Sequence, residues 1–221
     1  MISVYPTRRE YRLITPRSLT LEGYGVVSKA EEIAEREHDG HLRRDGHAEI
    51  DHSIAVAAMA KEGGHSASGQ ALAWIHDVCE NGANMPVPDS VGREFGPKYC
   101  CQISYNLDAL TQRKDEPVGS YFERIVQAAI DDHEVAFVKG YDRKHFHLCP
   151  YGRPEDEERN RGRRIAKCYE TLGPFRTAME RVRPFMPASR LAQFDELMSE
   201  IYYLAQIQLE QLESTIPRVL L

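Results

Sequence analysis

The chain has 221 residues and a formal net charge of −6 at pH 7, with 34 acidic and 28 basic side chains. This length is enough for one hydrophobic core, or for one domain with a helical extension. The acidic balance argues against non-specific nucleic-acid binding, which needs a basic face, although it permits a local basic pocket.

The cysteines and the first residues indicate a reducing compartment. There are five cysteines, an odd number without a C-x-x-C pair, so we expect no disulfide framework. The opening stretch "MISVYPTRREYRLITPRS" is too polar for a secretory leader, and no apolar run is long enough to span a bilayer. We therefore expect a soluble, cytoplasmic protein without a membrane partner.

In chain order, residues 1–27 contain short β-prone pieces and turn residues, and we expect an N-terminal arm there. From Ser28 the pattern becomes helical, because Ser28 and Glu31 form a capping-box sequence. After a charged, glycine-containing loop, two apolar helices are predicted over 51–62 and 66–82. Shorter helices are expected over 88–96, 97–111, 118–132 and 133–146.

The end of the chain predicts a charged linker over 147–164 and two long helices, "EERNRGRRIAKCYETLG" and "SRLAQFDELMSEIYYLAQIQLEQLES". Apolar residues recur at helical spacing in the last one, namely Leu191, Phe194, Leu197, Met198, Ile201, Leu204 and Ile207. This stripe either faces the core or mediates a homo-oligomer. No strand pattern follows residue 28, so we predict an all-α fold.

Four polar residues interrupt apolar helical patterns: His52, His76, Asp77 and Asp142. Imidazole nitrogens and carboxylate oxygens suit divalent ions such as Mn²⁺, Fe²⁺ or Zn²⁺. Such an ion lowers the pKa of a water molecule and clamps phosphate oxygens. The alternative for an adjacent His-Asp pair is purely structural: a histidine bonded to a backbone carbonyl beside a capping aspartate.

Three stretches decide between these interpretations: "REHDGHLRRDGHAEIDHSIAVAAMA", "WIHDVCENG" and "VKGYDRKHF". In this order and spacing they resemble the motifs of the HD-superfamily hydrolase domain of the RelA/SpoT family, which acts on the alarmone (p)ppGpp. The resemblance covers roughly residues 28–180. No synthetase domain follows, so the chain resembles a stand-alone small alarmone hydrolase.

The resemblance implies an HD-domain helical bundle over 28–180, followed by a C-terminal helical extension over 181–221. It implies a small-molecule nucleotide substrate whose 3′-diphosphate is removed, giving GDP or GTP and pyrophosphate. Mn²⁺ is the ion usual for the family, although another divalent ion is not excluded. The implied ligands are His52, His76, Asp77 and Asp142.

Other residues match family positions that handle protons or nucleotide. Glu80, one helical turn after His76, matches the catalytic glutamate. Arg43 and Arg44 match a loop that holds the nucleotide, and Lys139 matches the lysine of the third motif. Tyr121 lies near a nucleotide-contacting helix of the family. For these cationic residues, ordinary surface solvation is the alternative.

The chain departs from the family pattern at three informative positions. Asn81 replaces an aspartate and cannot accept a proton, so proton handling next to Glu80 is in doubt. Phe146 replaces an asparagine expected to face the pocket, and Asp45 replaces a serine. These changes leave two alternatives open: hydrolysis of another nucleotide, such as NADPH or a 3′-phosphorylated compound, or alarmone binding without turnover.

Three further histidines lie near the motifs. His38 matches the histidine of the first loop, and a structural role is expected. His145 and His147 flank Phe146. Either assistance to the metal or phosphate binding is an alternative for them, but we expect them at the surface, since histidine is commonly only partly buried.

Overall fold

The computed structural model describes residues 19–43, 46–82, 84–149 and 157–214, with the backbone alone for residues 81, 157–161 and 212–214. Within these ranges the chain is helical, and its only β-pairing is an isolated bridge between Leu42 and Ala48. The predicted all-α fold is therefore confirmed. The helices are α2 (Leu21–His38), α3 (Glu49–Glu62), α4 (Ala67–Ile75), α5 (Val78–Asn81), α6 (Pro88–Arg93), α7 (Cys100–Leu110), α8 (Val118–Asp131), α9 (Glu134–Leu148), α10 (Glu157–Val182) and α11 (Ala188–Ser214), with a 3₁₀ turn η2 (Arg183–Phe185).

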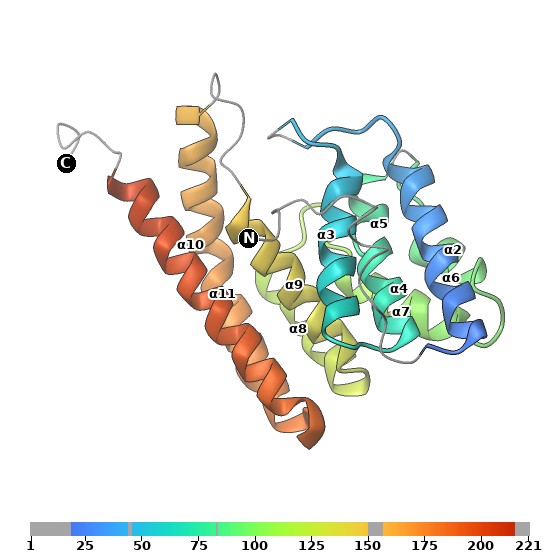
Figure 1. Cartoon of the computed structure of the whole chain (residues 1–221). Coiled ribbons are helices and arrows are strands. Elements are labelled where there is room, and N and C mark those ends of the chain that lie inside the picture. Colours follow the sequence, from blue (N-terminus) through green and yellow to red (C-terminus); the bar gives the residue numbers. More distant parts are fainter. Residues whose placement is uncertain (1–18, 44–45, 83, 150–156, 215–221) are drawn as a thin grey trace.

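Helix α4 is the centre of the bundle. It is flanked by α2, α3, α7 and α9, and every residue from Gly69 to Ile75 is buried (Figure 1). Small residues at Ala71 and Ala73 let these helices approach closely, while Trp74 fills the space between them. Because α4 ends in the middle of the bundle, the residues that follow it are held by packed helices on several sides.

Helix α2 begins earlier than the sequence predicts. The threonine Thr20 is its N-cap, and the Thr20 hydroxyl accepts a hydrogen bond from the backbone N–H of Gly23 at 3.1 Å. The predicted start at Ser28 was wrong, because Gly23 and Gly25 conceal the helical pattern of the first two turns. Residues 21–27 are thus helix and not arm, and residues 1–18 of the expected arm lie outside the described residues. The buried face continues across the expected boundary through Val26, Val27, Ala30, Ile33 and Ala34.

Helix α10 also extends beyond its predicted end near Gly173. It continues through Pro174, which removes one helical hydrogen bond at a cost of about 3 kcal/mol. The following turns bury Phe175, Ala178, Met179 and Val182, and this burial offsets that cost. The expected domain boundary at residue 180 therefore falls inside a helix that contacts α8.

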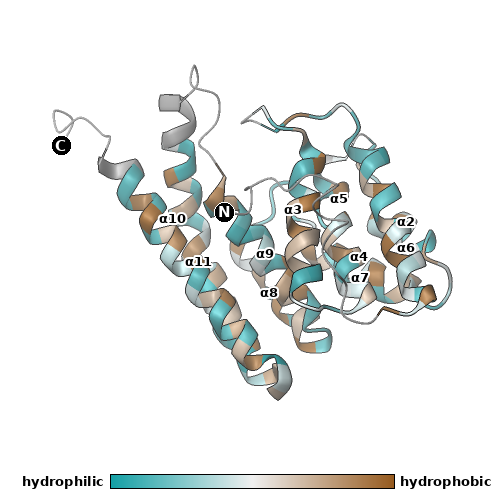
Figure 2. Cartoon of the chain, in the orientation of Figure 1, coloured by the Kyte–Doolittle hydropathy of each residue, from teal (hydrophilic) through white to brown (hydrophobic). Residues whose placement is uncertain are grey.

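Helices α10 and α11 form an antiparallel pair along one side of the bundle (Figure 1). Hydrophobic and hydrophilic positions alternate along α11 in Figure 2, as expected for a helix with one buried face. That face packs on α9, where Gly140 leaves room for Leu197 and Met198. The apolar stripe predicted for the last helix is thus part of the core contact. Among the described helices, none is long and apolar enough to cross a membrane.

Candidate metal centre

The predicted helix over 66–82 is broken, and the break positions two of the four candidate ligands. Helix α4 ends at Ile75, His76 is its C-cap, and Asp77 precedes α5 with φ −103° and ψ −5°. The Nδ1 atom of His76 lies 2.9 Å from the carbonyl oxygen of Ala73. A carbonyl only accepts, so the proton of a neutral His76 is on Nδ1, and its Nε2 lone pair faces the interior.

The four predicted ligand residues converge at this break. The Nε2 atom of His52, on α3, lies 3.1 Å from Nε2 of His76. The same His52 atom lies 3.4 Å from Oδ2 of Asp77 and 3.4 Å from Oδ1 of Asp142, on α9. Oδ1 of Asp77 lies 3.5 Å from Nε2 of His76. The structure therefore brings together side chains from three segments that are far apart in the sequence.

These separations fit one shared cation. Two atoms that each lie about 2.1 Å from an ion are about 3.0 Å apart at a right angle and about 3.4 Å apart at the tetrahedral angle. The separations of 3.1 Å between His52 and His76 and of 3.4 Å between His52 and Asp142 fall in this range. Asp77 lies beside them and approaches His52 and His76 through different carboxylate oxygens, at 3.4 and 3.5 Å. Burial lowers the pKa of His52, and the charge of Arg43 lowers it further. A hydrogen bond with Asp142 acts in the opposite direction but does not outweigh them. A low pKa favours the neutral imidazole, which is the form that binds metal ions.

The two carboxylates are held in their charged form. Burial alone would raise the pKa of Asp77, but His76 and His52 outweigh it and lower that pKa to about 2. Burial is likewise outweighed at Asp142, whose pKa is lowered mainly by Lys139. The Nζ atom of Lys139 donates to Oδ2 of Asp142 at 2.7 Å, so the other carboxylate oxygen is the one that faces His52.

His145 is a residue of the centre that the sequence analysis misplaced. It is fully buried, not at the surface as predicted, and its Nδ1 lies 2.8 Å from Nδ1 of His52. His147 is buried as well, beside Gln208 of α11, with 2.8 Å between Nδ1 and Oε1. The spacing from Asp142 to His145 is one helical turn, and this signal was available in the sequence. What the sequence does not show is its partner, His52, which lies 93 residues earlier in the chain.

The catalytic residues of the prediction lie on α5. Burial raises the pKa of Glu80, and the charge of Asp77 raises it further. One Glu80 oxygen, Oε1, accepts a hydrogen bond from the backbone N–H of Gln112. A raised pKa makes a carboxylate a stronger base towards a nearby water molecule. The backbone of Asn81 completes α5, while its side chain lies outside the described part of the chain.

The predicted nucleotide-binding residues are dispersed. Arg43 donates to Glu49 at 2.8 Å and acts electrostatically on His52, whereas Arg44 lies outside the described residues. Tyr121 is buried and its hydroxyl donates to the carbonyl of Leu110 at 2.7 Å. Its ring lies 5.2 Å from Nζ of Lys139. Tyr121 therefore packs beneath Lys139 and is not accessible for direct contact with a nucleotide.

Lys139 and Phe146 are also engaged with neighbours. Lys139 is buried, and although burial lowers its pKa, the carboxylate of Asp142 outweighs this effect and raises it. The partly exposed ring of Phe146 lies 4.3 Å from the guanidinium carbon of Arg164, on α10. The sequence analysis did not predict that α10 would reach this region.

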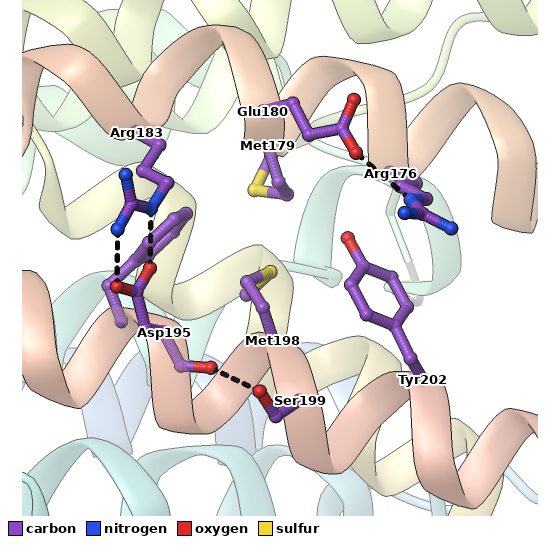
Figure 3. Close-up of a pocket in the computed structure, with 9 residues that line it drawn as sticks. Arg176, Met179, Glu180, Arg183, Asp195, Met198, Ser199 and Tyr202 are labelled. Carbon is purple, nitrogen blue, oxygen red and sulfur yellow. Dashed lines mark hydrogen bonds and ion pairs between the residues drawn. The ribbon is translucent and has the colours of Figure 1, made fainter.

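A cavity of about 230 Å³ opens elsewhere, between α10 and α11. Met179 and Met198 lie opposite one another across it, next to Tyr202 (Figure 3). The ion pair between Arg183 and Asp195, at 2.7 Å, closes one side. None of the predicted site residues lines this cavity, so it is separate from the metal centre.

The fold and the site thus define an all-helical protein in which two histidines and two aspartates converge in a partly buried cluster. No family model matches the chain. The chain is 29% identical over 126 residues to a Mycobacterium leprae protein named "Probable GTP pyrophosphokinase". This region covers 54% of the chain and 15% of that protein. The similarity supports relatedness to the RelA/SpoT family, which the sequence motifs indicate.

Proposed function

We propose that the protein is a divalent-metal-dependent phosphohydrolase that removes the 3′-diphosphate of (p)ppGpp, giving GDP or GTP and pyrophosphate. The observation that carries this proposal is the cluster formed by His52, His76 and Asp142, whose ligand atoms all lie within 4.8 Å of one another. Asp77 lies next to this group, with Oδ2 3.4 Å from Nε2 of His52, and is the proposed fourth ligand. Mn²⁺ is the ion that we expect there.

The residues around the cluster prepare it for a cation. The Ala73 carbonyl orients His76, Lys139 holds one oxygen of Asp142, and His145 contacts the far nitrogen of His52. Two histidines and two aspartates leave further coordination positions for water and substrate. When bound, a divalent ion supplies Lewis acidity, which lowers the pKa of water and polarises a phosphate group.

Glu80 is the proposed general base. It lies on α5, four residues after His76, and the Gln112 backbone N–H donates to one of its oxygens. The raised pKa of Glu80 is suited to accepting the proton of the attacking water and delivering it to the leaving side. Because the Asn81 amide cannot accept this proton, the carboxyl of Glu80 performs the transfer alone. We therefore expect a slower reaction than in a site with carboxyl groups at both positions.

The choice of substrate rests on chemistry and on the relative. The name "Probable GTP pyrophosphokinase" belongs to a protein of which the chain matches 15%. A guanosine nucleotide that carries pyrophosphate is consistent with both that name and the motifs. Arg43, and Arg44 on the same loop, are the proposed contacts to the nucleotide. Cytoplasmic localisation, as expected from the sequence, fits such a substrate.

A second candidate is hydrolysis of another phosphorylated nucleotide, such as NADPH. The observation that favours it is the environment of Phe146, whose ring is covered by Arg164 at 4.3 Å where the family pattern has a polar asparagine. A third candidate, alarmone binding without turnover, is favoured only by the substitution at Asn81.

The test is release of pyrophosphate from ppGpp by the purified chain with Mn²⁺, with NADPH and 3′-phosphorylated nucleotides assayed in parallel. We expect turnover of ppGpp, and its loss in His76→Ala and Asp77→Asn. His133→Ala is the matched control, because His133 is the N-cap residue of α9 and lies outside the cluster. Turnover of another nucleotide with inert ppGpp supports the second candidate. Binding of ppGpp without product from any nucleotide supports the third.

A further inference from the structure

Three cationic side chains surround one aromatic ring beside the metal centre. The guanidinium carbons of Arg164 and Arg143 lie 4.3 and 5.6 Å from the centre of the Phe146 ring, and Nζ of Lys167 lies 5.5 Å from it. Arg143 and Phe146 are on α9, whereas Arg164 and Lys167 are on α10. We call these four residues the Phe146 cluster.

The cluster adjoins the candidate metal ligands. Nε of Arg143 lies 3.8 Å from Oδ2 of Asp142. The guanidinium of Arg143 is also tied to α10, because it donates to the Thr171 hydroxyl at 3.2 Å. Although Lys167 is exposed, neighbouring protein atoms desolvate its ammonium group and lower its pKa, Arg143 lowers it further, and Asp142 and Asp77 act in the opposite direction. The Phe146 cluster is therefore close enough to the metal centre for the charges of the two to interact.

Like charges at such distances repel one another, and Asp142, whose Oδ2 lies 3.8 Å from Nε of Arg143, offsets part of this repulsion. The Phe146 ring offsets a further part, because the face of an aromatic ring attracts a cation. A multiply charged anion would bind at such a group of cations, because guanidinium groups fork onto phosphate oxygens and an ammonium acts as a point charge. Lys167 is exposed, so an anion from solvent can reach the cluster.

We propose that the Phe146 cluster is a binding subsite for a diphosphate group, and that Phe146 organises its cations instead of stacking on a nucleobase. One face of the ring is already covered by Arg164, which also donates to the Phe146 carbonyl. In the proposed reaction, this subsite would hold the leaving pyrophosphate next to the ion, and that role rests on the proposed function. Binding of pyrophosphate by the cluster does not depend on that function.

The test is calorimetric titration of the full-length, metal-free chain with inorganic pyrophosphate in the presence of a chelator. We expect binding that weakens with added salt. Lys167→Gln and Arg164→Gln should each weaken it about tenfold, since each removes a charge-assisted contact. Arg163→Gln is the matched control: it removes the same charge from an exposed position of α10 outside the cluster, and it should have no effect.

Two further arms separate an anion subsite from a base-stacking site. Phe146→Leu keeps an apolar side chain but removes the ring, and it should weaken pyrophosphate binding about threefold or more. Guanosine should not compete with pyrophosphate. The proposal is overturned if the wild type does not bind pyrophosphate, if Arg163→Gln weakens binding as much as Lys167→Gln, or if guanosine displaces the anion. Because no turnover is measured, these outcomes are independent of whether ppGpp is hydrolysed.

Discussion

The Nδ1 atom of His145 lies 2.8 Å from the Nδ1 atom of His52, and both imidazoles are buried. If His52 binds a cation through Nε2, its proton must be on Nδ1, which makes His145 the acceptor. His145 would then fix both the tautomer and the orientation of His52 without touching the ion. It is a positioning residue in the proposed centre.

We therefore predict that His145→Ala weakens Mn²⁺ binding about 10- to 100-fold, the usual cost of losing such a partner. Direct titration with Mn²⁺ measures this, and circular dichroism monitors the helices. His145→Gln retains an acceptor and should recover part of the affinity. Equal affinity in wild type and His145→Ala would show that His52 needs no such support.

Mn²⁺ should stabilise the folded chain. A ligand at 100 times its dissociation constant raises the free energy of unfolding by about 2.7 kcal/mol. We expect a corresponding increase in Tm for the wild type and none for His76→Ala or Asp142→Asn. A control that retains the cluster, His133→Ala, should respond to Mn²⁺ like the wild type. An equal increase in all four proteins would place the ion elsewhere.

Proton handling is expected to depend on α5. Glu80→Gln should reduce kcat about 10²- to 10⁴-fold, the range associated with general acid–base catalysis. Mn²⁺ affinity should be unchanged, because Glu80 is not among the four ligands. Asn81→Asp adds a second carboxyl and should raise kcat. A drop in Mn²⁺ affinity in Glu80→Gln would instead indicate a ligand role.

Acid stability should depend on a second buried network, which is distinct from the metal centre although Tyr141 and Asp142 are neighbours on α9. Oε2 of Glu134 lies 2.5 Å from Nδ1 of His65, whose Nε2 lies 2.8 Å from the Tyr141 hydroxyl. Burial alone would raise the pKa of Glu134, but His65 outweighs it and lowers that pKa from 4.5 to about 2. A carboxyl whose pKa is lower in the folded than in the unfolded chain stabilises the folded state at pH values above its unfolded pKa.

This stabilisation, of the order of 3 kcal/mol, is complete above pH 4.5 and is lost as the pH falls towards 2. We predict that Glu134→Gln lowers the free energy of unfolding at pH 6 and flattens its decline below pH 4.5. Urea unfolding at several pH values measures both. Glu62→Gln, at an exposed position of α3, should leave the pH profile unchanged.

The early start of α2 has its own test. Gly25 is exposed, lies inside the helix and has open space where a Cβ would be. Gly25→Ala should therefore stabilise the protein by about 1 kcal/mol, and Thr20→Ala should destabilise it by a similar amount through loss of the cap. Thermal unfolding measures both. If residues 20–27 were an irregular arm, neither change would have this effect.

The sequence by itself determined the local features of the fold. Apolar periodicity was sufficient to predict helices along most of the described chain, because a helix repeats its buried face every three or four residues. The order of the motifs also singled out His52, His76, Asp77 and Asp142, which the structure brings together. Where local signals were weak, at Gly23, Gly25 and Pro174, the predicted helix ends were wrong.

The tertiary structure decided which side chains face one another. Nothing local to His145 indicates burial, because its partner His52 lies on α3, 93 residues earlier in the chain. The break between α4 and α5 places His76 and Asp77 beside His52, which is again a contact between distant segments. The cations of α10 likewise meet Phe146 of α9 only in the folded chain. Burial and proximity between distant segments arise only when the whole bundle closes, so no sequence window contains them.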